Sequence, residues 1–187
     1  IKSIEKGQNG VALKLLKDAH YLDPSNNDAL YWLGFLLKRL NRLEEGAEAL
    51  SLVSERVPGM AEVEAALVDT FIAMDEPEGA VYHAQRLLDV APYEPTTLLK
   101  LADAYEANGK PDLAIDALNR APLHKPTLTD TLVDIHYRLG LLHESEGNTA
   151  QARDHFERVC ARDISYKDIR TRIQQFEPDS PSEATDA

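Results

Sequence analysis

The sequence predicts an all-α protein in which antiparallel helix pairs stack into an α-solenoid. Composition is the first reason: Leu and Ala dominate the 43% of hydrophobic residues, whereas aromatic residues make up only 6%. Leu and Ala favour helices, and a β-sandwich is usually richer in aromatic and β-branched side chains. An internal period is the second reason, because prolines recur every 34 residues, at Pro24, Pro58, Pro92 and Pro126. Such a period is typical of repeated two-helix units.

Apolar residues keep the same register as the prolines. Eight residues before each proline lies an apolar residue, namely Leu16, Leu50, Ala84 and Leu118. The first half of each unit has a leucine followed by a different apolar or small residue, as in Leu33-Gly34, Leu67-Val68 and Leu101-Ala102. These offsets place apolar residues on one helical face, and a small residue such as Gly34 would let two helices cross closely.

The pattern resembles the tetratricopeptide repeat, in which Trp-x2-Leu-Gly-x2-Tyr is followed by Ala-x3-Phe and Pro over 34 residues. The first complete unit matches with Leu30, Leu33, Gly34, Leu37, Gly46, Leu50, Val53 and Pro58. The match departs at the first signature position, where no unit has Trp and one has Glu64. The resemblance covers roughly residues 1 to 164 and implies a right-handed α-solenoid with a C-terminal capping helix.

The repeats divide the chain into a tetratricopeptide domain over residues 1–177 and a disordered acidic tail. We expect these segments: partial repeat 1–26, repeats 27–60, 61–94, 95–128 and 129–165, capping helix 166–177, and tail 178–187. The last repeat is displaced by four residues, which one added helical turn near residues 128–132 would absorb. Only Ile1 to Lys6 remain of the first helix, so we expect an upstream segment and a longer parent protein.

Turn residues support these divisions. One repeat position, between the two helices of a pair, holds Gly7, Asn41, Asp75, Gly109 and Gly147. All five are turn formers, so we expect each first helix to end there. Pro77 and Pro111 stand where second helices should begin, and a helix tolerates proline at that point because no N–H bond is lost.

Charge and hydropathy argue against two classes of partner. The chain has 20 basic and 32 acidic residues, a formal net charge of -12, which is opposite to the basic footprint of a nucleic-acid-binding protein. The longest uncharged apolar stretch, Leu30–Leu37, is too short to insert across a membrane. We expect a cytoplasmic protein, unless the chain belongs to an exported or membrane-anchored parent.

The sequence contains no motif of a catalytic or cofactor site. It lacks the phosphate-binding glycine motifs, HExxH and GxSxG. His136 and His143 share a helical face about 10 Å apart, too far to bind one zinc ion. Cys160 is the single cysteine, so no internal disulfide and no cysteine-based zinc site can form. We therefore expect no enzyme activity, no metal and no cofactor.

In the family, the first helices of successive repeats line a concave groove that holds a peptide or a helix. Transferred by position, the resemblance implies a groove formed by Tyr31, Trp32, Phe35, Lys38, Glu62, Asp69, Ile72, Leu99, Asp103, Glu106, Tyr137 and Leu141. Some relatives clamp a C-terminal carboxylate with Lys, Asn and Arg. Those positions hold Tyr31, Phe35, Ala66, Glu62 and Lys100 here, which argues against that ligand.

The groove combines an aromatic end with an acidic middle. Aromatic anchors within a polar rim are typical of binding hot spots, and the acidic residues favour a ligand with Lys or Arg. We therefore expect a basic peptide or amphipathic helix of another protein as the partner. An alternative interpretation is that Tyr31, Trp32 and Phe35 pack against the truncated first unit, or form an interface to upstream repeats.

A binding module or scaffold is thus the leading interpretation of function. Two alternatives stay open: a homo-oligomerising assembly scaffold, and a regulatory arm of a larger enzyme, secretion or envelope-assembly protein. The last stretch, with Phe156-Glu157-Arg158 and Tyr166-Lys167-Asp168, resembles the ends of many bacterial arrays and indicates a bacterial origin.

Overall fold

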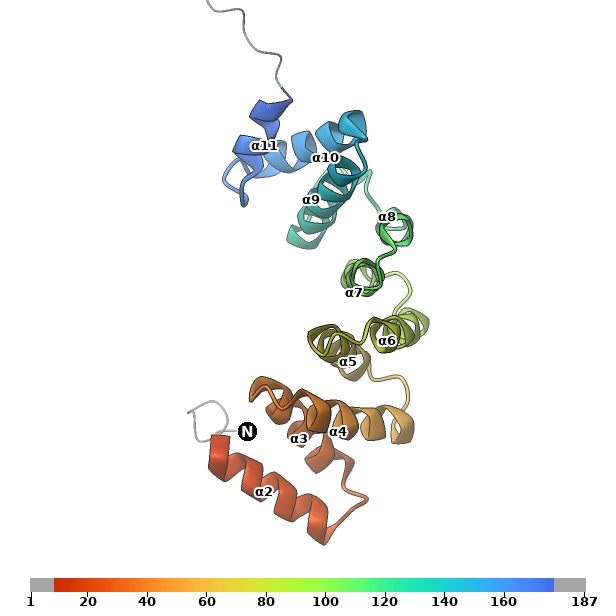
Figure 1. Ribbon diagram of the computed structural model, residues 1–187, viewed down its shortest axis with the longest axis vertical. Helices are drawn as coiled ribbons and strands as arrows, with labels where there is room; N and C mark the ends of the chain where they lie inside the picture. The colour runs from red at the N-terminus through yellow and green to blue at the C-terminus, as the bar shows by residue number, and fades with distance from the viewer. Residues whose placement is uncertain (1–8, 177–187) are drawn as a thin grey trace, which may run out of the picture. The chain divides into compact units, whose positions relative to one another are not determined.

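The computed structural model describes residues 9–176, and this part of the chain is helical with no β-strand. In chain order the helices are α2 (Asn9–Leu22), α3 (Asn27–Arg39), α4 (Leu43–Arg56), α5 (Ala61–Ala73), α6 (Pro77–Val90), α7 (Pro95–Ala107), α8 (Pro111–Leu118), α9 (Asp130–Ser145), α10 (Thr149–Arg162) and α11 (Ile169–Gln175) (Figure 1). The predicted all-α class is therefore confirmed.

The chain forms two compact units, Ile1–Ala114 and Ile115–Ala187. In unit 1, α3 packs against α4 and α5 against α6, while the first helices α3, α5 and α7 also contact one another in succession. In unit 2, α9 packs against α10, and α10 against α11. Each unit thus contains the antiparallel helix pairs expected from the repeat.

The core of unit 1 is formed by the apolar positions that recur in the sequence. Leu50, Val63 and Leu67 are completely buried in one cluster with Leu30 and Val53. Tyr31 and Phe35 pack against this cluster but keep part of their surface exposed. The same helix α3 therefore contributes leucines to the core and aromatic rings to the surface.

Close helix crossings explain the glycine that follows the leucine in two of the repeats. A β-carbon on Gly34 would lie 2.6 Å from Cγ of Leu50, which is closer than van der Waals contact allows. Gly140 faces the ring of Phe156 in the same way in unit 2. The expected role of the small residue is confirmed at both sites.

Backbone dihedral angles confirm the predicted turns. Asn41, Asp75, Gly109 and Gly147 have φ values of 58°, 59°, 65° and 77°. This left-handed conformation is accessible to glycine and tolerated by Asn and Asp, which explains the residue types at this repeat position. Pro77 and Pro111 are the first residues of α6 and α8, also as predicted.

The four additional residues of the last repeat are accommodated differently from the expectation. Helix α9 has 16 residues against 13 in α7, but α8 ends after only 8 residues. An irregular segment, residues 119–129, then leads to α9. Pro122 and Pro126 explain this segment, because a proline within a helix removes a hydrogen bond and clashes with the preceding turn. The four residues are thus accommodated by a longer α9 together with an irregular segment, and not by an added helical turn alone.

Two predicted segments, Ile1 to Lys6 and the tail 178–187, and the predicted turn at Gly7 lie outside the described residues. Helix α11 falls within the predicted capping segment 166–177. Between residues 9 and 176, no helix has the length and hydropathy needed to cross a membrane.

Candidate partner-binding groove

The aromatic end of the predicted groove is a cluster on one face of α3. The ring of Tyr31 contacts Trp32 edge-on, with a centroid distance of 5.1 Å, and Phe35 at 4.8 Å. Trp32 is 37% exposed, whereas Tyr31 and Phe35 are half-buried. Helical spacing places Tyr31 and Trp32 on the side of Phe35, because they lie four and three residues before it. Tyr31 and Trp32 are neighbours in the chain.

A cleft of about 580 Å³ opens beside these rings. Its walls are Tyr31, Trp32, Phe35 and Leu36, with Lys38 and Arg39 at the next turn. Burial raises the pKa of the Tyr31 hydroxyl, and the nearby carboxylate of Glu62 raises it further. The cleft thus combines apolar and aromatic walls with the cationic side chains of Lys38 and Arg39. The exposed Glu62 lies near Tyr31.

The middle of the predicted groove is a ladder of alternating charges. Nζ of Lys38 lies 3.0 Å from Oδ2 of Asp69, and Nζ of Lys100 contacts the other oxygen of the same carboxylate. Lys100 also lies 3.9 Å from Asp103. Burial alone would raise the pKa of Asp69, but the two lysines outweigh this effect and hold it below its ordinary value.

This ladder changes the electrostatic interpretation of the groove. The sequence predicts an acidic middle from the carboxylates alone, but Asp69 is engaged by two lysines from α3 and α7. Ile72, Leu99, Asp103 and Glu106 are half-buried on α5 and α7. Their positions give the middle of unit 1 a mixed apolar and charged surface in place of a row of free carboxylates.

The two predicted groove residues of unit 2 lie in different surroundings. Tyr137 is only 8% exposed, and its hydroxyl donates a hydrogen bond to Asp168. Nζ of Lys167 lies 4.4 Å from the centre of its ring, and the ring of Tyr166 packs edge-on at 5.4 Å. Leu141 is half-buried one turn further along α9. The segment before α11 therefore covers Tyr137.

Polar contacts fix this covering segment on α9. Asp134 accepts a hydrogen bond from the hydroxyl of Tyr166 and lies 3.4 Å from Nζ of Lys167. Arg172 on α11 pairs with Glu144 on α9. Sequence reasoning missed this arrangement, although the basic and aromatic residues after position 165 match the acidic and aromatic positions of α9.

Glu64, which replaces the signature tryptophan in one repeat, is buried in a polar network. It is 1% exposed, and its carboxylate oxygens lie 2.8 Å from Nδ1 of His83 and 3.0 Å from Nε of Arg86. The hydroxyl of Ser54 donates a third bond at 2.6 Å. Because the carboxylate is fully partnered, this network fixes α4, α5 and α6 relative to one another.

These features define a helical-repeat scaffold with an exposed aromatic cleft, a class of protein that is typically non-enzymatic. The chain belongs to the tetratricopeptide repeat family: models described as Tetratricopeptide repeat match residues 3–69, 71–134 and 134–163. The fold therefore implies protein partners and a role as an interaction scaffold. No curated protein matches the sequence significantly.

Solved structures share the same fold at low sequence identity. A crystal structure of MamA aligns with a TM-score of 0.78 and 23% identity, over 87% of this chain and 93% of that chain. MamA from Desulfovibrio magneticus RS-1, residues 41 to the end, aligns with a TM-score of 0.76 and 18% identity, over 89% of this chain and 92% of that chain. TTC0263, a thermophilic tetratricopeptide protein of Thermus thermophilus, aligns with a TM-score of 0.63 and 21% identity, over 91% of each chain.

Proposed function

We propose that the face of α3, α5 and α7 binds an amphipathic helix or extended segment of another protein, with basic side chains on the bound segment. The exposed aromatic cleft of Tyr31, Trp32 and Phe35 carries this proposal. Clustered aromatic residues beside a polar rim supply large apolar contact at low entropic cost, as binding hot spots do.

An internal contact in unit 2 supports the type of ligand. Tyr137 occupies on α9 the repeat position that Tyr31 occupies on α3, and the chain's own Lys167 lies over its ring. A cation above an aromatic face is favourable because the ring's quadrupole is negative there. A basic side chain from a partner would find the same kind of contact at Tyr31, with Glu62 nearby.

Fluorescence of Trp32 tests the proposal directly, because Trp32 is the single tryptophan of the chain. Two synthetic amphipathic helices with identical apolar faces, one with Lys and Arg and one with Glu on the polar face, would be titrated into the protein. We expect the basic peptide to shift the emission and to bind more tightly. Tighter binding of the acidic peptide would refute the charge preference.

A double variant, Tyr31→Ala with Phe35→Ala, tests the location of the site. Fluorescence anisotropy of the labelled basic peptide should show no saturable binding to it. The matched control is Tyr93→Ala, because Tyr93 is 89% exposed in the turn between α6 and α7. Equal peptide affinity of parent and double variant would place the site on another surface.

A second candidate function, a homo-oligomerising scaffold, is supported by the outer surface of α2. Val11, Leu15 and Leu22 are 56%, 58% and 82% exposed, and their spacing of four and seven residues places them along one side of the helix. Light scattering at two concentrations, with Leu15→Glu as the variant, tests this function. A parent that stays monomeric at both concentrations would exclude it.

A further inference from the structure

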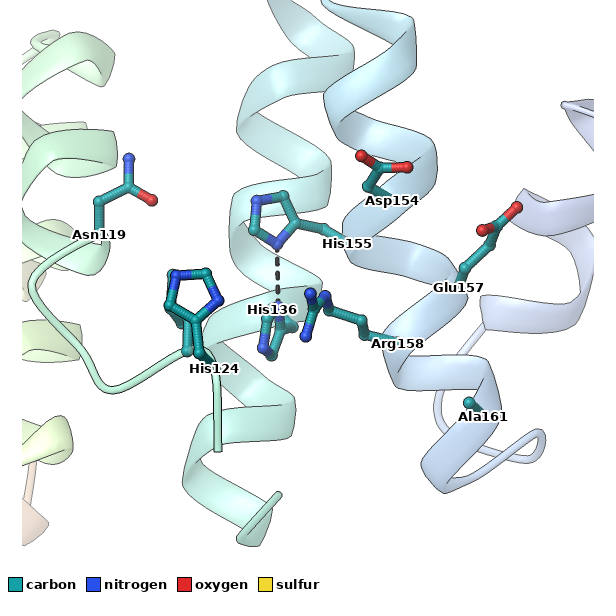
Figure 2. A pocket seen from close by; sticks show the side chains of 9 residues that line it. Asn119, His124, His136, Asp154, His155, Glu157, Arg158 and Ala161 are labelled. Atoms are coloured by element: carbon teal, nitrogen blue, oxygen red, sulfur yellow. Dashed lines mark hydrogen bonds between the residues drawn. The ribbon is translucent and has the colours of Figure 1, made fainter. Parts of the chain in front are cut away.

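A second cleft lies within unit 2, and its residues are separate from those of the predicted groove. It has a volume of about 720 Å³ and is formed by the segment after α8, by α9 and by α10. Figure 2 shows four nitrogen-bearing side chains gathered in it, His124, His136, His155 and Arg158, with Asn119 on the opposite side.

The pair of His136 and His155 supplies the most buried polar atoms of this cleft. Their Nδ1 atoms lie 2.9 Å apart, so one ring donates a hydrogen bond to the other. His136 is 1% exposed, and its Nε2 has no well-formed hydrogen bond with the part of the chain described. The Leu123 backbone nearby favours the protonated ring. A buried nitrogen without a firm partner is costly, and a bound acceptor would relieve that cost.

The charges that act on these two rings are cationic. Burial, followed by the charges of His136, His143 and Arg158, lowers the pKa of His155 to about 4. Burial and the charges of Arg158 and His124 lower the pKa of His136. Burial is the first cause of both shifts, so both imidazoles are neutral near pH 7, and Arg158 is a permanent cation beside them.

Two carboxylates, Asp154 and Glu157, also line the rim of the cleft. Glu157 pairs with Arg153 at 2.7 Å, and in Figure 2 its carboxylate points away from the histidines. Asp154 is exposed. In Figure 2 the guanidinium of Arg158 extends towards His136. An anion of external origin would complete this set of donors.

A metal ion fits the cleft less well than an anion. Within residues 9–176, no group of three or more His, Cys, Asp or Glu side chains has the geometry of a metal site. Guanidinium and imidazole N–H groups are instead donors to oxyanions, and Arg prefers phosphate because its planar fork matches two oxygens.

We propose that the cleft of His124, His136, His155 and Arg158 binds a phosphate monoester. Arg158 and His124 contact the phosphate from the rim, and the His136–His155 pair donates from the interior. The volume exceeds what a phosphate alone fills, which leaves room for the group that carries it along Leu123 and Ala161. The site is independent of the α3 groove, since all its residues belong to unit 2.

Binding of a phosphate monoester should be coupled to proton uptake. A bound anion raises the pKa of adjacent imidazoles, so protonation of the histidines favours binding as the pH falls, until the phosphate itself takes up its second proton at about pH 6. The titratable and charged groups facing the site are His124 from the segment after α8, His136 and His143 from α9, and Asp154, His155, Glu157 and Arg158 from α10.

Calorimetry of the full chain with O-phosphoserine tests the proposal, with side-chain NMR of the histidines as a second readout. We expect saturable binding that shifts the resonances of His136 and His155. Arg158→Gln should weaken binding roughly tenfold, since it removes a charge-assisted hydrogen bond. Arg170→Gln on the exposed side of α11 makes the same charge change in the same unit and should leave affinity unchanged.

Three outcomes would overturn the proposal. They are equal affinity of parent and Arg158→Gln, unchanged histidine resonances at saturation, and Zn²⁺ alone displacing O-phosphoserine from the same histidines. A phosphoserine peptide and its unphosphorylated form distinguish the sources of the phosphate. Much tighter binding of the phosphopeptide than of O-phosphoserine would identify a phosphorylated partner protein, and equal binding would identify a free phosphate monoester.

Discussion

Tyr31 on α3 and Tyr137 on α9 occupy the same repeat position but have different surroundings. Tyr31 is half-buried beside the 37% exposed Trp32 and lines an open cleft. Tyr137 is 8% exposed, because the chain's own segment around Tyr166 and Lys167 covers it and Asp168 accepts its hydroxyl hydrogen bond. Both helices place an aromatic ring on the same face of the repeat, yet only one ring borders an open cleft.

The difference shows that the repeat pattern determines where a side chain points but not what covers it. An apolar first-helix face at the end of an array needs a cover to stay out of water. In unit 2 that cover comes from the residues that follow α10, whereas in the described part of unit 1 the cleft on α3 is open. In such arrays, a first-helix face is therefore available to a partner only where no segment of the chain itself covers it.

The largest expected effect is on the free energy of unfolding, when the covered ring of Tyr137 is removed. Tyr137→Ala should lower the free energy of unfolding by about 3 kcal/mol, since it removes a buried aromatic ring and leaves a cavity. Tyr31→Ala should cost about 1 kcal/mol, because a half-exposed ring loses less contact. Urea denaturation followed by circular dichroism measures both values.

Tyr93→Ala provides the baseline for this pair, because Tyr93 is 89% exposed and its loss should be nearly neutral. Similar costs for the Tyr31 and Tyr137 variants would contradict the difference in burial on which the comparison rests.

The second expected effect is a loss of stability in mild acid from the histidines of unit 2. The folded pKa of His155 is about 4, below the unfolded value of about 6.5. Between these values the unfolded chain binds more protons, so stability should fall as the pH decreases, by at most about 1.4 kcal/mol per pH unit for this residue. Thermal unfolding between pH 7 and pH 4.5, in buffers without phosphate, measures the slope.

His155→Gln isolates the contribution of this ring, because glutamine keeps a polar side chain but does not titrate. Its unfolding free energy should depend less steeply on pH than that of the parent. His136 and His83 keep part of the slope in both proteins, since burial lowers their pKa values as well. An unchanged slope would show that His155 is not buried in solution.

The fold follows from the sequence because it depends on local, repeated causes. The 34-residue period, the leucines and small residues, and the positive-φ positions at Asn41 and Gly109 each act within one helix pair. The irregular segment after α8 was harder to predict, because four extra residues fit either into a helix or into a loop. Pro122 and Pro126 were the available signal.

The site was less predictable, because it depends on contacts between segments far apart in sequence. The position of Tyr31 on α3 follows from the period, but the cover over Tyr137 depends on how residues 165–172 fold back. Likewise, Asp69 looks like a free carboxylate in the sequence until lysines 31 residues away on either side reach it. Charge counts alone therefore overestimate the negative potential of the groove.

A smaller effect is expected from the charge ladder. Asp69→Asn should cost less than about 1 kcal/mol at neutral pH, because the carboxylate is 39% exposed and solvent screens its ion pairs. Its pKa is lowered in the folded state, so the contribution is present above the unfolded pKa of about 3.9 and is lost as the pH falls through the folded value. Comparing parent and variant by urea denaturation at neutral pH and near pH 3 measures this. A difference that grows in acid would contradict the assignment.

The smallest expected effect comes from a substitution that gives one position of α3 the residue found at the same repeat position of α9. Lys38 occupies the repeat position of Glu144, which pairs with Arg172 in unit 2. Lys38→Glu also removes the ion pair with Asp69, so it adds one carboxylate and partly frees another. It should therefore tighten binding of the basic amphipathic peptide by a factor of up to about five, the value of one exposed ion pair. Lys14→Glu on the exposed side of α2 changes the net charge equally. Equal gains for both variants in the Trp32 titration would mean that the peptide responds to overall charge. A gain confined to Lys38→Glu would mean that it lies along α3, as the segment before α11 lies along α9.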